Sequence, residues 1–128
     1  MFVNASIRTS NIEKSIDFYC RLLGLKVLSR KEIKRTNAEI AFLQDPEGKG
    51  CTLELTYYKN QKKFSQPDYE ERIFDHLGFV VNSMTKTIDA MKKEKIAIAD
   101  EPFQFSATTK IAFIEDPDGT LIELIERK

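Results

Sequence analysis

Cysteine is scarce in this chain of 128 residues, tryptophan is absent, and neither sign of charge predominates. Cys20 and Cys51 form no C-x-x-C spacing, which argues against a disulfide framework, a zinc site or a dithiol redox centre. We expect both to be buried thiols packed among apolar neighbours. The 20 basic residues balance the 20 acidic ones, so the chain lacks the positive field that attracts nucleic acid or an anionic membrane surface. Neither nucleic acid nor a membrane is therefore an expected partner.

Hydrophobic runs are also short. No segment holds the roughly 20 consecutive apolar residues that a membrane-spanning helix needs. Residues 1–6 lack the basic and apolar segments of a secretory signal, so the expected location is the cytoplasm. A length of 128 residues suits one domain that covers the whole chain.

An internal repeat is the main feature that the chain does contain. Residues 40–48 read IAFLQDPEG, and residues 111–119 read IAFIEDPDG. Residues 11–17 align in the same way with 83–89, and a closing segment at 52–55 aligns with 121–124. Self-similarity of this extent indicates two copies of one structural module.

Each half shows the same order of local signals: a strand, a helix and three strands. Ser10 and Glu13 can form a capping box for the first helix, which Gly24 ends, and Ser83 can cap a second helix that ends before Lys95. The D-P-x-G tetrapeptides predict β-turns between the last two strands of each half. The expected strands are 2–8, 25–33, 38–44 and 51–58, then 76–82, 96–99, 108–114 and 120–126.

The predicted fold class is α+β, with two tandem βαβββ modules that form a curled mixed sheet around a shared cleft. Neither module is large enough to close a core alone, so the two sheets are expected to lie side by side. We assign module one to residues 1–58, a polar connector to 59–75, and module two to 76–128.

Equivalent positions of the repeat carry four polar residues that can face one another. Asn4 is equivalent to His76 on the opening strands, and Glu54 is equivalent to Glu123 on the closing strands. Taken singly, each glutamate could simply face solvent, and a lone histidine is more often satisfied by packing than bound to a metal. The matched pair of carboxylates beside the single histidine instead favours a metal site for Ni, Zn, Co, Mn or Fe.

These segments resemble the glyoxalase I branch of the vicinal oxygen chelate superfamily over nearly the whole chain. The resemblance is carried by residues 15–19 with 23–25, by 53–57, by His76, and by 111–119 running into 122–124. It implies a lactoylglutathione lyase-like activity on the hemithioacetal of methylglyoxal and a thiol, with a divalent metal, Ni or Zn first and Co or Mn next. The superfamily also holds dioxygenases, epimerases and metal-free antibiotic-binding proteins, so its motif does not fix one reaction.

The resemblance also implies roles for individual residues. Glu54, His76 and Glu123 match three metal ligands, while Asn4 stands where the family has a histidine, so Asn4 binds weakly or water replaces it. The metal would polarise two vicinal substrate oxygens and stabilise an enediolate while a carboxylate moves the proton. Glu123 is the expected base and Glu54 the second ligand, although the repeat also allows the opposite assignment.

Substrate recognition departs further from the family pattern. Arg8 matches an arginine that pairs with the glutathione γ-glutamyl carboxylate. Tyr58 replaces an asparagine, and residues 103–107 replace a Lys-Gly-Gly type loop, so Tyr58, Phe103 and Phe105 indicate a more aromatic pocket or else core or interface positions.

Family members are commonly homodimers. By that resemblance, one chain would supply Asn4 and Glu54 and the other His76 and Glu123, and a cleft closed within one chain is the alternative.

Two other functions remain open at this point. A metal-free protein that sequesters a small aromatic molecule would use His76 only for hydrogen bonding. An Fe(II) dioxygenase is less favoured, because its ligand set needs two histidines and the chain has one.

Overall fold

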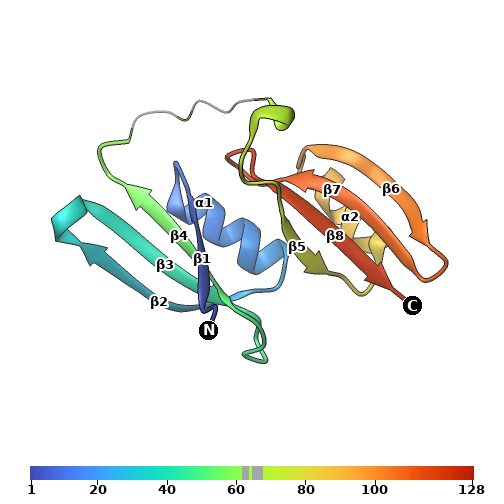
Figure 1. The fold of residues 1–128 in the computed structure, drawn as a ribbon, viewed down its shortest axis with the longest axis horizontal. Helices are drawn as coiled ribbons and strands as arrows, with labels where there is room; N and C mark the ends of the chain where they lie inside the picture. Colours follow the sequence, from blue (N-terminus) through green and yellow to red (C-terminus); the bar gives the residue numbers. More distant parts are fainter. Residues whose placement is uncertain (62–63, 65–67) are drawn as a thin grey trace. The chain divides into compact units, whose positions relative to one another are not determined.

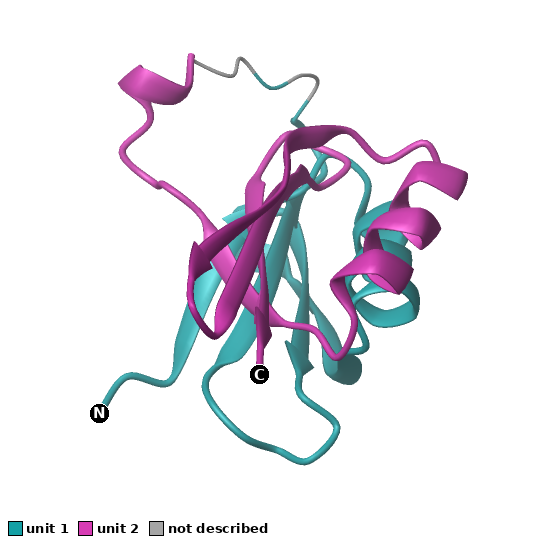
Figure 2. Ribbon diagram, turned by 90° about the vertical axis from the view of Figure 1, so that its right-hand side faces the viewer, with its two compact units in different colours: residues 1–65 teal, residues 66–128 magenta. Residues whose placement is uncertain are grey.

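Two units with the same order of elements make up the chain, residues 1–65 and residues 66–128 (Figure 2). The computed structural model describes residues 1–61, 64 and 68–128. Residues 62–63 and 65–67 of the predicted connector lie outside the described residues.

The first unit contains a four-stranded mixed sheet with the order β1-β4-β3-β2 (Figure 1). Strand β1 runs parallel to β4, and the other neighbours are antiparallel. Its elements are β1 (Asn4–Arg8), α1 (Ile12–Asp17), a π-helical segment (Phe18–Leu22), β2 (Lys26–Ile33), a 3-10 turn (Lys34–Thr36), β3 (Ala38–Gln44) and β4 (Thr52–Tyr58).

The second unit repeats this arrangement with the order β5-β8-β7-β6, in which β5 runs parallel to β8. Its elements are a 3-10 turn (Tyr69–Glu71), β5 (Leu77–Val80), α2 (Met84–Lys93), β6 (Ile98–Ser106), β7 (Thr109–Glu115) and β8 (Leu121–Arg127). The α+β class and the twofold βαβββ order are therefore confirmed, while the shared cleft stays a prediction.

Strand pairing follows the repeat residue by residue. Glu54 of β4 is paired with Ser6 of β1, and the equivalent Glu123 of β8 is paired with Gly78 of β5. A phenylalanine of the antiparallel neighbour pairs with each glutamate, Phe42 in the first unit and Phe113 in the second. The two carboxylates thus occupy the same register of two similar sheets.

Each core lies between one face of the sheet and the helix of that unit (Figure 2). Leu55 and Leu124 are fully buried on that face, next in sequence to the two glutamates. Because side chains alternate along a strand, the glutamates point to the opposite face. Burial of such leucines is worth roughly 2–3 kcal/mol each, which fixes the side of the sheet on which the carboxylates stand.

Helix capping differs from the prediction in the first unit. Asn11, not Ser10, caps α1: its backbone is extended and its side chain accepts a hydrogen bond from Lys14 N at 3.1 Å. The predicted capping box is therefore wrong, whereas Ser83 does cap α2 through Lys86 N at 3.3 Å.

The predicted first helix is also irregular in its second half. It continues beyond Asp17 as a π-helix, in which Leu23 N donates to Phe18 O at 3.2 Å. Sequence periodicity predicted a uniform α-helix because the apolar stripe passes through this segment unchanged.

Both predicted β-turns are present. Gly48 N donates to Asp45 O at 2.8 Å, and Gly119 N donates to Asp116 O at 3.0 Å. The two glycines have φ of 73° and 88°, a left-handed conformation that other residues adopt at a cost. These turns set the registers of β4 and β8.

The outer strands β2 and β6 are irregular. Strand β6 continues to Ser106, well beyond the predicted end at residue 99, and its pairing with β7 shifts register at three places. Pro102 lies among these shifts, which explains why the segment did not resemble a strand. Strand β2 is exposed over Lys26 to Glu32 and has one register shift.

The C-terminal end of the predicted connector packs against the second unit. Arg72 donates from Nη1 to Gly119 O at 2.8 Å and stacks on the Tyr69 ring, 4.4 Å from its centroid. The Tyr69 hydroxyl donates to Glu115, which raises the pKa of Tyr69. The connector is thus part of the folded unit from Tyr69 onward.

The two cysteines differ from expectation. Cys51 is exposed just before β4, so the prediction that both thiols are buried is wrong, and Cys20 is half-buried. Burial and the nearby Asp17 charge raise the pKa of Cys20.

Among the described ranges, no helix is long and apolar enough to cross a bilayer.

Candidate functional site

Glu54 lies in a polar cradle on the face of the first sheet away from α1. Its Oε2 accepts a hydrogen bond from Asn4 Nδ2 at 2.9 Å, and its Oε1 accepts one from Thr56 Oγ1 at 3.0 Å. Ser6 Oγ lies 3.4 Å from the same Oε1 and 2.8 Å from Thr56 Oγ1. The structure therefore brings the predicted pair Asn4 and Glu54 into direct contact.

Arg8 and Tyr58 lie farther along the same two strands. The Arg8 guanidinium carbon is 4.8 Å from the centroid of the Tyr58 ring, a cation–π contact. Alternation along β1 and β4 places these two residues on the face that carries Glu54. Two of the predicted substrate-binding residues thus stand together beside the Glu54 cradle.

His76 and Glu123 form the corresponding pair in the second unit. His76 Nε2 lies 3.2 Å from Glu123 Oε2, and its Nδ1 lies 2.5 Å from Asp75 Oδ1. The ring also packs edge-on against Phe113, with centroids 5.5 Å apart. His76 therefore has one carboxylate at each ring nitrogen, Asp75 at Nδ1 and Glu123 at Nε2.

The space beside Glu123 is kept open by Gly78. A Cβ atom at this position would stand 3.7 Å from Glu123 Oε2 and 3.6 Å from Ile125 Cδ1. In the first unit the equivalent residue is Ser6, whose hydroxyl occupies that space. The repeat is therefore symmetric in its glutamates and asymmetric in their neighbours.

Sequence reasoning did not identify Ser6, Thr56, Asp75 or Gly78 as part of these clusters. The alternation of side chains along a strand could have identified two of them, because Ser6 is two residues from Asn4 and Thr56 is two residues from Glu54, on the same strand faces. Asp75 adjoins His76 in the sequence and Gly78 follows it by two. Listing the same-face neighbours of the four repeat positions would have found Ser6, Thr56 and Gly78, and Asp75 would have been found as the residue next to His76.

The donor set suits a divalent cation. Glu54 and Glu123 supply carboxylate oxygens, His76 supplies an imidazole nitrogen, and Asn4 has an amide oxygen besides the nitrogen that donates to Glu54. Within residues 1–61, 64 and 68–128, no group of three or more His, Cys, Asp or Glu side chains forms a complete metal site. Each unit contributes a two-residue part of the predicted set.

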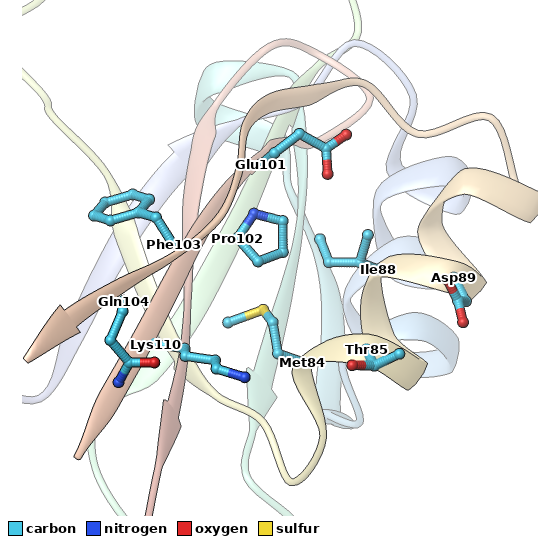
Figure 3. A pocket seen from close by; sticks show the side chains of 9 residues that line it. All are labelled: Met84, Thr85, Ile88, Asp89, Glu101, Pro102, Phe103, Gln104 and Lys110. Carbon is cyan, nitrogen blue, oxygen red and sulfur yellow. The ribbon is translucent and has the colours of Figure 1, made fainter. Parts of the chain in front are cut away.

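The aromatic residues of β6 lie apart from Glu123. Phe103 and Phe105 are 40% and 68% exposed, and their strand is separated from β8 by β7. A pocket of about 420 Å³ opens between α2 and β6, where Met84, Ile88 and Pro102 form its apolar wall, and the Phe103 ring points away from α2 (Figure 3). That pocket is on the helix side of the sheet, opposite the face that carries Glu123.

Comparison with known proteins identifies the family. Residues 2–124 match the model of the glyoxalase/bleomycin resistance protein/dioxygenase superfamily. The chain belongs to this superfamily. The match runs through both units and includes all four repeat positions.

Relatives within the superfamily cover almost the full chain. It is 33% identical to a probable lactoylglutathione lyase of Vibrio cholerae over 98% of this chain and 90% of the relative. It is 30% identical to the lactoylglutathione lyase of Escherichia coli O157:H7 over 98% of this chain and 92% of the relative. The solved glyoxalase I of Leishmania major, described as trypanothione-dependent, aligns with a TM-score of 0.81 and 29% identity over 97% of this chain and 84% of that one.

Proposed function

We propose that this chain is a metal-dependent glyoxalase-type lyase that isomerises the hemithioacetal of methylglyoxal and a thiol. The observation that carries the proposal is the pair of carboxylates at one register of two similar sheets, each beside a nitrogen-bearing side chain. The relatives named lactoylglutathione lyase support the reaction class.

The proposed ligands are Glu54, His76 and Glu123, with Asn4 or a water in the fourth place. In this proposal the Asn4–Glu54 and His76–Glu123 pairs serve one cation, with units from one chain or from two chains of a homodimer. Ni²⁺ or Zn²⁺ suits a mixed imidazole and carboxylate set, and Co²⁺ or Mn²⁺ is the next choice. When bound, the cation supplies polarisation of the two adjacent substrate oxygens.

Glu123 is the proposed base. It would take the proton from the carbinol carbon of the hemithioacetal and return it to the neighbouring carbon, while the hydroxyl proton passes from the carbinol oxygen to the neighbouring oxygen. One C–H and one O–H bond break, and one of each forms. Its side chain is 20% exposed, and its neighbours His76 and Phe113 pack against each other, which restricts water around the carboxylate. Residual exposure gives a substrate access to it.

Arg8 is the proposed anchor for a carboxylate of the thiol part of the substrate, since a guanidinium pairs with a carboxylate in a two-pronged manner. Tyr58 holds the Arg8 guanidinium from one side. Phe105, exposed on β6, is proposed as an apolar contact for the substrate, and the thiol itself is to be identified by assay.

Calorimetric titration of the chelator-stripped protein with Ni²⁺ and Zn²⁺ tests the proposal before a substrate is chosen. We expect one cation per site and loss of binding in Glu54→Ala and His76→Ala. Glu47→Ala, an exposed glutamate in the β3–β4 turn, is the control and should bind as the wild type does. If the wild type binds neither metal, the enzyme proposal fails and a metal-free binding function replaces it.

Turnover is measured next on hemithioacetals of several thiols. Glu123→Gln should lower kcat by about 10²–10⁴, the usual contribution of a positioned general base. Undiminished turnover in this variant would remove Glu123 from the proposed role. Circular dichroism of each variant establishes that the fold is retained.

A further inference from the structure

Two hydroxyl groups distinguish the surroundings of Glu54 from those of Glu123. Thr56 Oγ1 lies 3.0 Å from Glu54 Oε1, and Ser6 Oγ lies 2.8 Å from Thr56 Oγ1. Thr56 is only 8% exposed, so water competes little for its hydroxyl. The equivalent residues of the second unit, Gly78 and Ile125, carry no hydroxyl.

The number of hydroxyl hydrogens determines which of these contacts are hydrogen bonds. Ser6 and Thr56 have one hydroxyl hydrogen each, so they can donate to only two of the three short contacts that they share with Glu54. The two shortest distances are satisfied when Ser6 donates to Thr56 and Thr56 donates to Glu54. A donor that is itself hydrogen-bonded is polarised and binds a carboxylate more strongly.

Asn4 donates a hydrogen bond to the other carboxylate oxygen of Glu54. Asn4 Nδ2 donates to Oε2 at 2.9 Å, so each oxygen of this carboxylate accepts one directed bond. One lone pair on each oxygen is left for a cation. Hydrogen bonds at both oxygens therefore fix the orientation of the Glu54 carboxylate. In Glu123, Oε2 lies 3.2 Å from His76 Nε2.

Resting on the proposed function, we infer that Ser6 and Thr56 are positioning residues that hold Glu54 as a fixed metal ligand. Gly78 and Ile125 offer the equivalent Glu123 no hydroxyl, so that, apart from the His76 contact at Oε2, its carboxylate can reorient between the two carbons that exchange the proton. Glu54 and Glu123 occupy equivalent positions of the repeat but have different proposed roles, metal ligand and base. The difference follows from the two hydroxyls of Ser6 and Thr56, whose equivalents in the second unit, Gly78 and Ile125, carry none.

Metal affinity in the absence of substrate provides the first test. Thr56→Val keeps the shape of a buried side chain and removes its hydroxyl, and we expect it to weaken Ni²⁺ binding by about 10–100-fold, as loss of a partner of a metal ligand commonly does. Thr56→Ser should restore affinity to within about threefold, because the donor returns. Ser6→Ala, at an exposed position, should weaken binding less than Thr56→Val does.

Thr52→Val is the matched control for these variants. Thr52 lies on the same face of β4, but its hydroxyl donates to Val3 O at 3.2 Å instead of to Glu54. It should bind Ni²⁺ as tightly as the wild type. Unchanged affinity in Thr56→Val, or no recovery in Thr56→Ser while circular dichroism shows a native fold, would overturn the positioning role.

A transplant into the second unit tests the other half of the inference. Gly78→Ser with Ile125→Thr places both hydroxyls beside Glu123, and the Cβ of residue 78 has only ordinary contacts there. We expect kcat to fall by about tenfold with KM and Ni²⁺ affinity little changed, because the restraint acts on proton transfer. Unchanged kcat would show that mobility of Glu123 does not matter.

The two proposals fail in different ways. A wild type that binds Ni²⁺ but turns over no hemithioacetal would refute the proposed reaction, and the Thr56 series would still support or overturn the positioning of Glu54. A wild type that binds no metal would overturn both.

Discussion

The turn between β7 and β8 allows a stability difference between equivalent residues of the repeat to be worked out. Asp116 is 6% exposed, and its Oδ1 accepts hydrogen bonds from Asp118 N at 2.9 Å and Thr120 N at 2.8 Å. The equivalent Asp45 is exposed and accepts one such bond, from Glu47 N at 2.8 Å. Substitution by alanine therefore removes unequal support from two turns of the same sequence type.

The expected magnitudes follow from the bonds that are lost. A hydrogen bond to a charged group contributes roughly 1.5–3 kcal/mol, and a buried amide left without a partner costs the upper part of that range. Asp116→Ala should lower the free energy of unfolding by about 3–5 kcal/mol. Asp45→Ala should lower it by about 1 kcal/mol, because water replaces the lost partner at an exposed amide. Asp116→Asn keeps an acceptor oxygen and should fall between the two.

Urea denaturation followed by far-UV circular dichroism measures these losses, since the chain has no tryptophan to report by fluorescence. With a slope of about 1–3 kcal/mol per molar urea, the midpoint of Asp116→Ala should fall by about 0.7–4 M more than that of Asp45→Ala. Equal midpoint shifts in the two variants would refute the argument that burial of the turn aspartate determines its contribution to the free energy of unfolding.

Three further predictions concern single side chains. Asn4→His should tighten Ni²⁺ binding by at least tenfold in calorimetry, because imidazole is a better donor than an amide; unchanged affinity would place residue 4 outside the ligand set. A thiol-specific disulfide reagent at pH 8 should label exposed Cys51 first, since burial raises the pKa of Cys20; equal rates would contradict this. The Arg21 hydrogen bond lowers the pKa of Asp17, so the pair stabilises the fold above the ordinary carboxyl pKa and ceases to do so as pH falls through the lowered value. Arg21→Ala should thus reduce the melting temperature at pH 7 but not at pH 2, and equal reductions at both values would exclude the ion pair as the cause.

Much of the fold was predictable because the repeat presents each local signal twice. The D-P-x-G turns, the closing strands and the Ser83 cap depend on neighbours in sequence, and the structure confirms them. The contact of Asn4 with Glu54 was also anticipated, since the matched positions pointed to it.

Other features depend on pairing between distant segments and were not predictable in the same way. Ser6 reaches the Glu54 cradle only because β1 runs parallel to β4, which no local pattern encodes. The role of Phe105 in a substrate pocket stays a prediction, because the sequence of an irregular strand does not reveal which face an aromatic residue occupies. The exposure of Cys51 has the same origin, because the strand begins one residue later than predicted.

The irregular outer strands bear on the behaviour of the protein at high concentration. Strand β2 carries three basic residues, one acidic residue and a register shift along its outer edge, and β6 carries Pro102 and three such shifts. Edges of this kind are poor templates for a strand from another molecule, because the unpaired amides and carbonyls are not in line. Growth of either sheet into a fibril by strand addition at β2 or β6 is therefore disfavoured by the backbone itself.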